Sequence, residues 1–435
     1  MLRERKQQFL TRLEQLLGAV QESERQEIMS DFESHFQEAY EAGRSEEEIF
    51  RSLGSEQAIA REILAQYGME LPSVQEPTAA EKEAGPNAAS SDRGASAHSI
   101  FTAPPGSRID SPLRLIRLET DVVDVHLDTH DGEDILYHFD SFDAGQFDVR
   151  EAREGDIYRL IVQLRRSGMK RFFSSVSGTL HVRIPASFGG SVEMACGSGD
   201  AEVRQIRAEC FDAELKSGDL TIRDSTCGHI TTRMKSGDAE LHNCTCVKAD
   251  LHTLSGDVTI FGLQADEFAL RAASGDIELH QLAAQALRAE LLSGDMHIVE
   301  GQGATWTFTA ACGDLELASI AADVHIDVAS GSISTRNVCG SLTVLAKSGE
   351  VECELASGTR QAALENKAGN VRLLVPSEMQ ELELEASTVL GAVSVRLPQF
   401  PEGHVQTSRF RGRLGENGPK VQLATKVGSI SVASI

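Results

Sequence analysis

A three-residue phrase, Ser-Gly-Asp, recurs through the middle of the chain at an almost constant spacing. The glycines of nine copies, some of them degenerate, are 19 residues apart six times and then 18 apart twice. These glycines are Gly199, Gly218, Gly237, Gly256, Gly275, Gly294, Gly313, Gly331 and Gly349. A fixed period near 20 residues is typical of a solenoid, in which each repeat is one coil that buries its apolar face by stacking on its neighbours.

The residues between the glycines alternate in the manner of β-strands. In Leu220–Ile222 two apolar residues flank a threonine, and the same positions alternate in the other copies. A second alternating stretch lies 12 to 16 residues after each glycine, as in Phe211–Leu215. A period of two indicates strands with one buried face. The pattern predicts a mainly β fold, a β-solenoid with about 19 residues per coil and two short strands in each, with regular coils over about 196–391.

A small all-α domain is expected to precede the solenoid, over residues 1–71. Phe9, Leu10, Leu13, Leu16 and Leu17 lie on one face of a first predicted helix. Three further helices are expected over about 23–42, 45–53 and 59–67.

Residues 72–110 are rich in Ala, Ser, Glu, Gly and Pro and lack periodicity, which predicts a flexible linker. Residues 111–435 form the predicted solenoid domain. The irregular strands of 111–195 are expected to cover the first regular coil, because an open solenoid end is an exposed β edge. The segment Gly428–Val432 repeats the pattern once more, and we expect it to leave an exposed last coil.

Composition excludes several classes of function. The net charge of −25 argues against nucleic acid as a partner, because phosphates demand a basic surface. The sequence has no run of 18 apolar residues, so no transmembrane segment is predicted. The charged start Met1–Lys6 does not resemble a signal peptide. Eight scattered cysteines indicate a reducing compartment. We therefore expect a cytoplasmic protein, with the cell surface or a membrane-associated position as the alternative.

The helical part resembles the HAAS helical signalling domain of bacteria. The resemblance rests on Asp31-Phe32, His35-Phe36, the run Gly43–Ile49, Leu53-Gly54 and the run Ala60–Ile63. It implies a protein partner for this domain, because HAAS-type proteins often accompany PadR-type transcription regulators. Such proteins commonly have transmembrane helices after the helical domain, whereas a polar linker stands there in this chain.

The remainder resembles the putative-adhesin β-solenoid family of unknown function. The features that carry this resemblance are a strand that ends in Ile-Pro at Leu180–Pro185, the Ser-Gly-Asp series and the closing Gly428–Val432. The resemblance implies a β-solenoid and supplies no catalytic residue.

The aspartates of the phrase are expected to stack in one column. One interpretation is that each carboxylate accepts a hydrogen bond from turn amides. The other is a ladder of divalent-cation sites, since Ca²⁺ favours clustered carboxylates. The candidate metal ligands are Asp200, Asp219, Asp238, Asp257, Asp276, Asp295 and Asp314.

Two smaller clusters of side chains could also be either metal sites or structural residues. Cys227 and Cys246 occupy equivalent positions in adjacent coils, which predicts Cα atoms about 5 Å apart. With Cys244, His229 and His242 nearby, either a metal or redox site or a column of small buried residues would fit.

The second cluster joins His126 and His130 with Asp124, Asp128 and Asp131, as either a metal site or an exposed strand and turn. Phosphate loops, nucleophile elbows and H-E-x-x-H are absent from the sequence.

The sequence therefore favours a non-enzymatic interaction or scaffold protein, which acts in bacterial signalling or envelope-stress regulation through its helical domain. A surface adhesin or envelope-associated binding protein is the first alternative, and a divalent-cation-binding solenoid is the second. A polysaccharide lyase is the enzymatic alternative, which the short coils disfavour because they leave little room for the loops that wall a cleft.

Overall fold

The structure is a computed structural model, and it forms two compact units. These are residues 1–97 with 165–176, and residues 98–164 with 177–435. The residues described are 2–18, 25, 29, 36, 59–60, 101–102, 113–141, 146–165, 178–398, 400 and 405–435.

In the first unit, helix α1 spans Leu2–Leu16. Phe9, Leu10 and Leu13 are at most 4% exposed, so one face of the helix is buried as the sequence predicts. Phe36 packs edge-on against Phe9, with ring centroids 5.8 Å apart. The three other predicted helices lie outside the described residues, apart from isolated helical positions.

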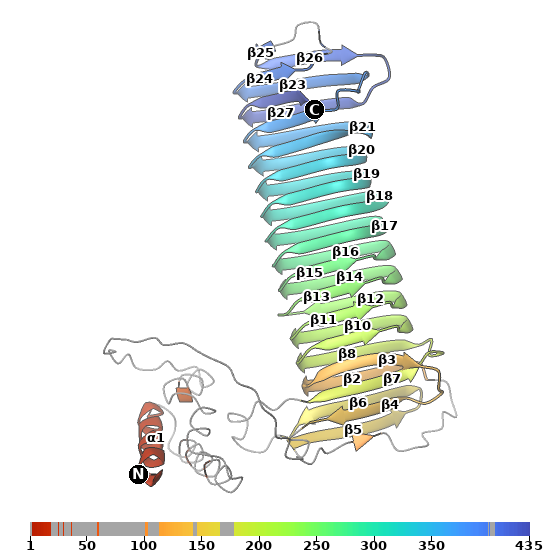
Figure 1. Cartoon of the computed structure of the whole chain (residues 1–435), viewed down its shortest axis with the longest axis vertical. Coiled ribbons are helices and arrows are strands. Elements are labelled where there is room, and N and C mark those ends of the chain that lie inside the picture. The colour runs from red at the N-terminus through yellow and green to blue at the C-terminus, as the bar shows by residue number, and fades with distance from the viewer. Residues whose placement is uncertain are drawn as a thin grey trace, which may run out of the picture. The chain divides into compact units, whose positions relative to one another are not determined.

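The second unit is a β-solenoid of parallel coils (Figure 1), which confirms the predicted fold class. Each early coil has a long strand and a short strand, and equivalent residues of successive coils pair in register, as Leu220 does with Ala239. The long strands are β8 Ser191–Ser198, β10 Arg207–Ser217, β12 Thr226–Met234, β14 Thr245–Ser255 and β16 Gln264–Ser274. The short strands are β9 Ala201–Arg204, β11 Leu220–Arg223, β13 Ala239–His242 and β15 Val258–Phe261.

From Ile277 onwards the short and long parts of a coil form one continuous strand. These strands are β17 Ile277–Ser293, β18 Met296–Cys312, β19 Leu315–Ser330, β20 Ile333–Ser348 and β21 Val351–Ala368.

Seven positions of each regular coil point into the core. In the 19-residue coils, counted from the glycine, they are the second, fourth, seventh, ninth, twelfth, fourteenth and sixteenth; in the 18-residue coils the last three fall one residue earlier, as Val324, Ile326 and Val328 do after Gly313. In the coil after Gly237 they are Ala239, Leu241, Cys244, Cys246, Ala249, Leu251 and Thr253. The seventh and ninth form a third side of the coil that the two-strand prediction missed. Burial of each large aliphatic side chain stabilises the stack by roughly 1.5–3 kcal/mol.

One coil carries the only tryptophan, and its core adapts to that side chain. Trp306 is fully buried and donates a hydrogen bond from Nε1 to the carbonyl of Ala284 at 2.8 Å. The seventh and ninth positions of this coil are Gly301 and Gly303. A Cβ on Gly301 would lie 2.1 Å from the indole, so the glycines leave the space that the ring fills.

The repeated glycine allows the coils to approach each other at one corner. The φ angles of this column lie between +114° and +142°, a region that side chains rarely adopt. A Cβ on Gly256 would lie 2.0 Å from the carbonyl oxygen of Gly237 in the coil before it. Both the backbone angle and the contact therefore require glycine.

The chain order and the stacking order differ at the N-terminal end of the solenoid. Strands β2 and β3 pair in parallel with β6 and β7 on one side and with β8 and β9 on the other. In Figure 1 the orange strands β2 and β3 accordingly lie among yellow strands that follow them in sequence. Antiparallel β5, β4 and β1 end the stack, so the covering strands of this segment are present. Their bounds are β1 Phe101–Thr102, β2 Leu115–Val122, β3 Asp124–His130, β4 Leu136–Asp140, β5 Phe147–Glu154, β6 Ile157–Leu164 and β7 Thr179–Pro185.

At the C-terminal end of the solenoid, a pair of strands is likewise inserted between coils that precede it in sequence. Strands β27 and β28 pair in parallel with β21 and β22 on one side and with β23 and β24 on the other. The coil of Gly428 is thus inside the stack, which corrects the expectation that it is an exposed last coil. Antiparallel β26 and β25 end the stack. The bounds are β22 Val371–Val375, β23 Leu382–Leu390, β24 Val393–Arg396, β25 Val405–Thr407, β26 Arg409–Leu414, β27 Lys420–Val427 and β28 Ile430–Ser434.

The glycine corner gives a direct test of the stacking. We expect Gly256→Ala to lower the free energy of unfolding by at least about 2 kcal/mol, because a left-handed angle and a backbone overlap coincide there. Chemical denaturation followed by circular dichroism measures the change. Gly189→Ala is the control, since an added Cβ at Gly189 meets nothing within 4 Å. Equal stability of the two variants would contradict this account of the corner.

Candidate functional site

The aspartates of the repeated phrase form a hydrogen-bonded ladder along one corner. The amide of Asp276 donates to Oδ1 of Asp257 at 2.8 Å, and the amide of Asp257 donates to Oδ1 of Asp238 at the same distance. The ladder begins at Asp124 and ends where the amide of Ser332 donates to Asp314. All seven predicted aspartates belong to it, and Asp124 joins them because β3 is inserted next to β9.

The hydrogen bonds of this ladder offset the mutual repulsion of the stacked carboxylates. Unit charges about 4 Å apart in water repel by about 1 kcal/mol, whereas a hydrogen bond to a charged group contributes roughly 1.5–3 kcal/mol. One oxygen of each carboxylate is therefore engaged within the protein. Within the described residues, no group of three or more His, Cys, Asp or Glu side chains is arranged to hold a metal ion. The Ca²⁺ ladder stays a prediction.

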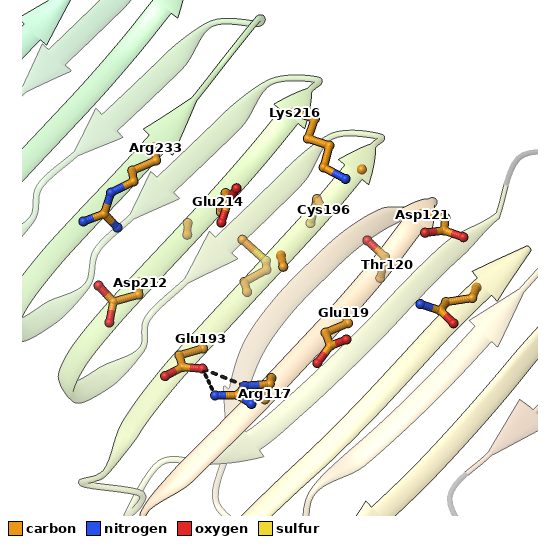
Figure 2. A pocket seen from close by; sticks show the side chains of 15 residues that line it. Arg117, Glu119, Thr120, Asp121, Glu193, Cys196, Asp212, Glu214, Lys216 and Arg233 are labelled. Atoms are coloured by element: carbon orange, nitrogen blue, oxygen red, sulfur yellow. Dashed lines mark hydrogen bonds and ion pairs between the residues drawn. The ribbon is translucent and has the colours of Figure 1, made fainter.

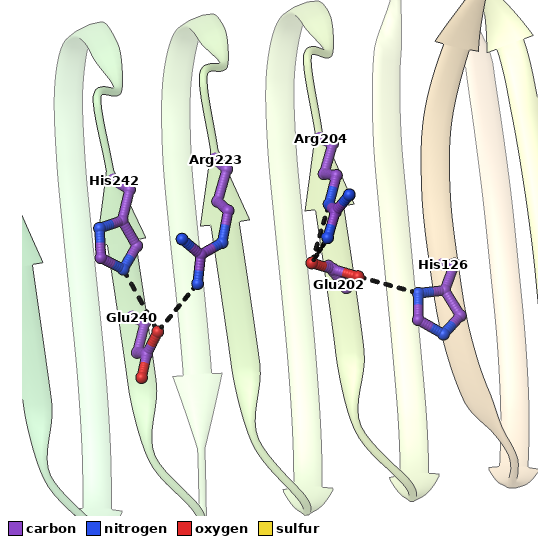
Figure 3. A network of polar contacts seen from close by, with 6 residues as sticks. All are labelled: His126, Glu202, Arg204, Arg223, Glu240 and His242. Carbon is purple, nitrogen blue, oxygen red and sulfur yellow. Dashed lines mark hydrogen bonds and ion pairs between the residues drawn. The ribbon is translucent and has the colours of Figure 1, made fainter.

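A polar network covers the outer face of the short strands (Figure 3). Glu202 bridges His126 on β3 and Arg204 on β9, with His126 Nδ1 at 3.1 Å and Arg204 Nε at 2.8 Å. Two coils further along, Glu240 bridges Arg223 at 3.3 Å and His242 at 3.2 Å. Acidic and basic side chains are therefore neighbours on the outer face of the short strands, and each of these two glutamates is paired with basic residues.

The network sets the charge of Glu202. Burial raises the pKa of its carboxyl, but the hydrogen bonds from Arg204 and His126 outweigh that effect and lower the pKa below its usual value. Glu202 is therefore ionised at neutral pH and holds both partners.

The cysteine cluster consists of free thiols in the core. Cys227 pairs in register with Cys246, and both side chains are at most 7% exposed. Burial raises the pKa of each of these thiols to about 12. Cys244 is also buried, and burial raises the pKa of its thiol. The arrangement matches the interpretation as small buried residues, with the thiols protonated at neutral pH.

The predicted histidine pair does not come together. His130 closes the turn after β3, where its Nε2 lies 2.7 Å from the carbonyl of Asp134 and its Nδ1 accepts from the amide of Gly132. His126 instead stacks on His181 of β7, which is also a neighbour of His138 on β4. Sequence spacing could not indicate the contact of His126 with His181, because β3 and β7 are neighbours only through the insertion of β3.

A shallow hollow of about 500 Å³ lies on the outer face of the long strands (Figure 2). Arg117 on β2 and Glu193 on β8 form an ion pair in it, with Arg117 Nε 2.7 Å from Glu193 Oε2. Its charged lining residues are Arg117, Glu119, Asp121, Glu193, Asp212, Glu214, Lys216 and Arg233. Acids outnumber bases, as in the chain as a whole.

Comparison with family models assigns the chain to a protein family. The family model described as Toastrack DUF4097 matches residues 114–319 and 265–433, which together span most of the chain. The chain belongs to the DUF4097 toastrack family. The HAAS family model matches residues 8–62 of this toastrack protein.

Three solved structures are similar to this toastrack protein at low sequence identity. A putative adhesin from Bacteroides fragilis is 14% identical with a TM-score of 0.36, and the match covers 56% of this chain and 98% of that one. A putative cell adhesion protein from Clostridium sporogenes is 9% identical with a TM-score of 0.18, covering 78% and 99%. A putative adhesin from Parabacteroides distasonis is 11% identical with a TM-score of 0.29, covering 78% and 97%.

Curated proteins gave no match. Among the described residues of the toastrack protein, no helix is both long and apolar enough to span a bilayer.

Substitutions in the aspartate ladder can distinguish the contribution of the carboxylate charge to stability from that of the hydrogen bond. We expect Asp257→Ala to lower the free energy of unfolding by about 0.5–1.5 kcal/mol, because the amide of Asp276 loses its acceptor while the repulsion from the neighbouring carboxylates is relieved. Asp257→Asn keeps an acceptor oxygen and removes a repelling charge, so it should stay within about 0.5 kcal/mol of the parent. Thermal and chemical denaturation measure both. A loss of stability for Asn as large as that for Ala would show that the charge, and not only the acceptor oxygen, is required.

Burial also predicts which cysteines react. In the native protein at pH 8 we expect an aromatic disulfide reagent to modify the exposed Cys312, while Cys227 and Cys246 remain unmodified because their thiols are buried and protonated. Mass spectrometry after timed quenching identifies the modified residues, and Cys312→Ser is the control. Modification of Cys227 as fast as that of Cys312 would contradict the packing of this column.

Proposed function

We propose that this toastrack protein is a non-enzymatic interaction protein, in which the helical unit binds a regulatory protein and the solenoid supplies a rigid acidic surface. The observation that carries the proposal is the regular parallel stacking of the coils, in which like residues pair from coil to coil apart from register shifts between β18 and β19 and between β20 and β21. Their corner carboxylates bond to the next coil, and their outer faces carry columns of paired charges. A stack held in this way suits binding of an extended partner better than chemistry at one point.

The helical unit is the proposed signalling element. The match of residues 8–62 to the HAAS model supports a regulatory role. On α1, one face is buried, whereas Thr11, Arg12, Glu14 and Gln15 are exposed and available to a partner. We propose that the partner is a bacterial regulatory protein of a PadR-type system, engaged in the cytoplasm during signalling or envelope stress.

Affinity capture from native cells tests this assignment. The baits are the full chain, a chain that lacks residues 1–72, and the full chain with Leu13→Ala. Leu13 is fully buried in α1, so the substitution should cost about 2–5 kcal/mol in the helical unit alone. We expect one partner to be captured by the full chain and lost from both variants. Circular dichroism checks that the β signal of the solenoid is unchanged.

The same experiment decides the first alternative, a surface adhesin or envelope-associated binding protein. Partners that the chain without residues 1–72 retains, especially envelope components, would make the solenoid the binding element. Protease treatment of intact cells would then degrade the protein. Complete protection in intact cells, together with loss of the partner on truncation, would rule the adhesin reading out.

The second alternative, a divalent-cation-binding solenoid, rests on the aspartate column. The second oxygen of each carboxylate is the candidate ligand, because Oδ1 already accepts an amide. Calorimetry and thermal unfolding with millimolar Ca²⁺ test it, with Asp257→Asn as the matched variant. Absence of binding heat and of any shift in melting temperature would remove this alternative.

A further inference from the structure

Three exposed apolar side chains lie together at one corner of the C-terminal end of the solenoid. Val389 is 74% exposed, Leu390 65% and Val427 51%, and Leu390 pairs in register with Val427. Among the exposed large apolar side chains of the described residues, Val389 and Leu390 have the largest exposed fractions. Strands β23 and β27, which carry the three, lie in the blue part of Figure 1. Single exposed apolar residues are normal on a surface, whereas a contiguous group is a candidate interaction site.

A row of lysines stands beside this apolar group. Lys347, Lys367 and Lys426 are neighbours from coil to coil, because the residues on both sides of each lysine pair in register. Lys426 and Val389 are neighbours for the same reason. All three lysines are exposed, and within the described part of the chain none of them has an ion-pair partner. Stacked positive charges repel one another, so this row favours a partner that carries negative charge.

The negative charge of the aspartate ladder is lost at the same end. The ladder position holds Asn370, Ser429 and Ala392 in the last coils. The amide of Ser429 donates to Oδ1 of Asn370 at 3.0 Å, so the hydrogen bond between coils is kept while the charge is removed. Exposed charges are screened over about 8 Å at physiological ionic strength, so the aspartates of the preceding coils act only weakly here.

The local charge is therefore positive on a protein whose net charge is −25. The carboxylates nearest in sequence to the lysines are Glu350 and Glu365. Arg409 on β26 pairs with Ser387, two residues before Val389, and adds a fourth positive charge. Four basic side chains thus stand against two acidic ones beside the exposed apolar group.

The size and shape of this surface favour a lipid surface over a folded protein partner. A stable protein–protein interface takes about 800 Å² and roughly 20–30 residues from each partner, far more than three apolar side chains supply. The side chains also lie on a corner, where the strands turn, and so project outward. Interfacial membrane binding needs less, because apolar side chains enter the headgroup boundary while basic ones attract anionic lipids.

We propose that this apolar–basic corner, formed by Val389, Leu390, Val427, Lys347, Lys367 and Lys426, binds a membrane surface that contains anionic lipids. The apolar side chains enter the headgroup boundary, and the lysines contact lipid phosphates. Binding is reversible, because only a few side chains take part. It does not depend on the regulatory partner proposed for the helical unit.

Co-sedimentation of the full chain with vesicles at physiological ionic strength tests the proposal. One set of vesicles is phosphatidylcholine alone, and the other contains one-third phosphatidylglycerol. We expect at least tenfold stronger binding to the anionic vesicles, which added salt weakens. Val389→Asp with Leu390→Asp should bind them at least tenfold more weakly than the parent. Lys367→Gln with Lys426→Gln should do the same, since each lysine near an anionic surface contributes about fivefold.

Matched controls separate this corner from the rest of the surface. Lys216→Gln with Lys235→Gln removes the same charge from the equivalent position of two coils near the N-terminal end, and Val247→Asp changes a valine that is 54% exposed. Both should bind as the parent does. Leu13→Ala, which disrupts the helical unit alone, should also leave vesicle binding unchanged, so failure of either proposal leaves the other standing.

The outcomes decide between a membrane and a protein as the partner. Melting checks that each variant folds, and Val427→Asp replaces the double aspartate variant if that one does not. Absence of parent binding to the anionic vesicles would overturn the proposal, as would equal losses in the corner variants and their controls. Loss of a captured protein in Val389→Asp with Leu390→Asp, without vesicle binding by the parent, would make the corner a protein-docking site instead.

Discussion

The close approach of neighbouring coils at the glycine corner is the constraint on which the rest of the solenoid depends. Each corner glycine lies against the carbonyl of the preceding one, at a backbone angle that side chains rarely adopt. Because the corners stay in contact, the parallel strands keep their register through most of the series of coils, with local shifts between β18 and β19 and between β20 and β21. Register then sets everything else, since it places like residues in columns both inside and outside the stack.

The columns have different physical roles. Inside, seven small and aliphatic positions per coil make a narrow core, and Trp306 fits only because Gly301 and Gly303 leave room for it. At the corner, the aspartates convert a repulsive row of carboxylates into a ladder of charge-assisted hydrogen bonds. Outside, Glu202 and Glu240 pair with bases of adjacent coils.

Both ends of the stack solve the problem of an open parallel edge in the same way. The coil nearest each end of the solenoid sequence, β2–β3 or β27–β28, is inserted one place inside, and antiparallel strands close the outside. An inserted coil cannot leave without breaking two ladders, so the terminal segments are held more firmly than an end coil would be.

The sequence by itself determined the solenoid, its period, the glycine corner and the seven repeated members of the aspartate column, because each depends on a local pattern that repeats at fixed spacing. It also indicated the buried face of α1. Only the tertiary structure decided the third side of each coil, the insertion of β2–β3 and β27–β28, and the contacts of His181 with His126 and His138. The insertions and the histidine contacts join segments whose separation follows no period. Hydrogen bonding at the open ends of the stack sets which strands become neighbours there. The periodic sequence pattern does not indicate this order.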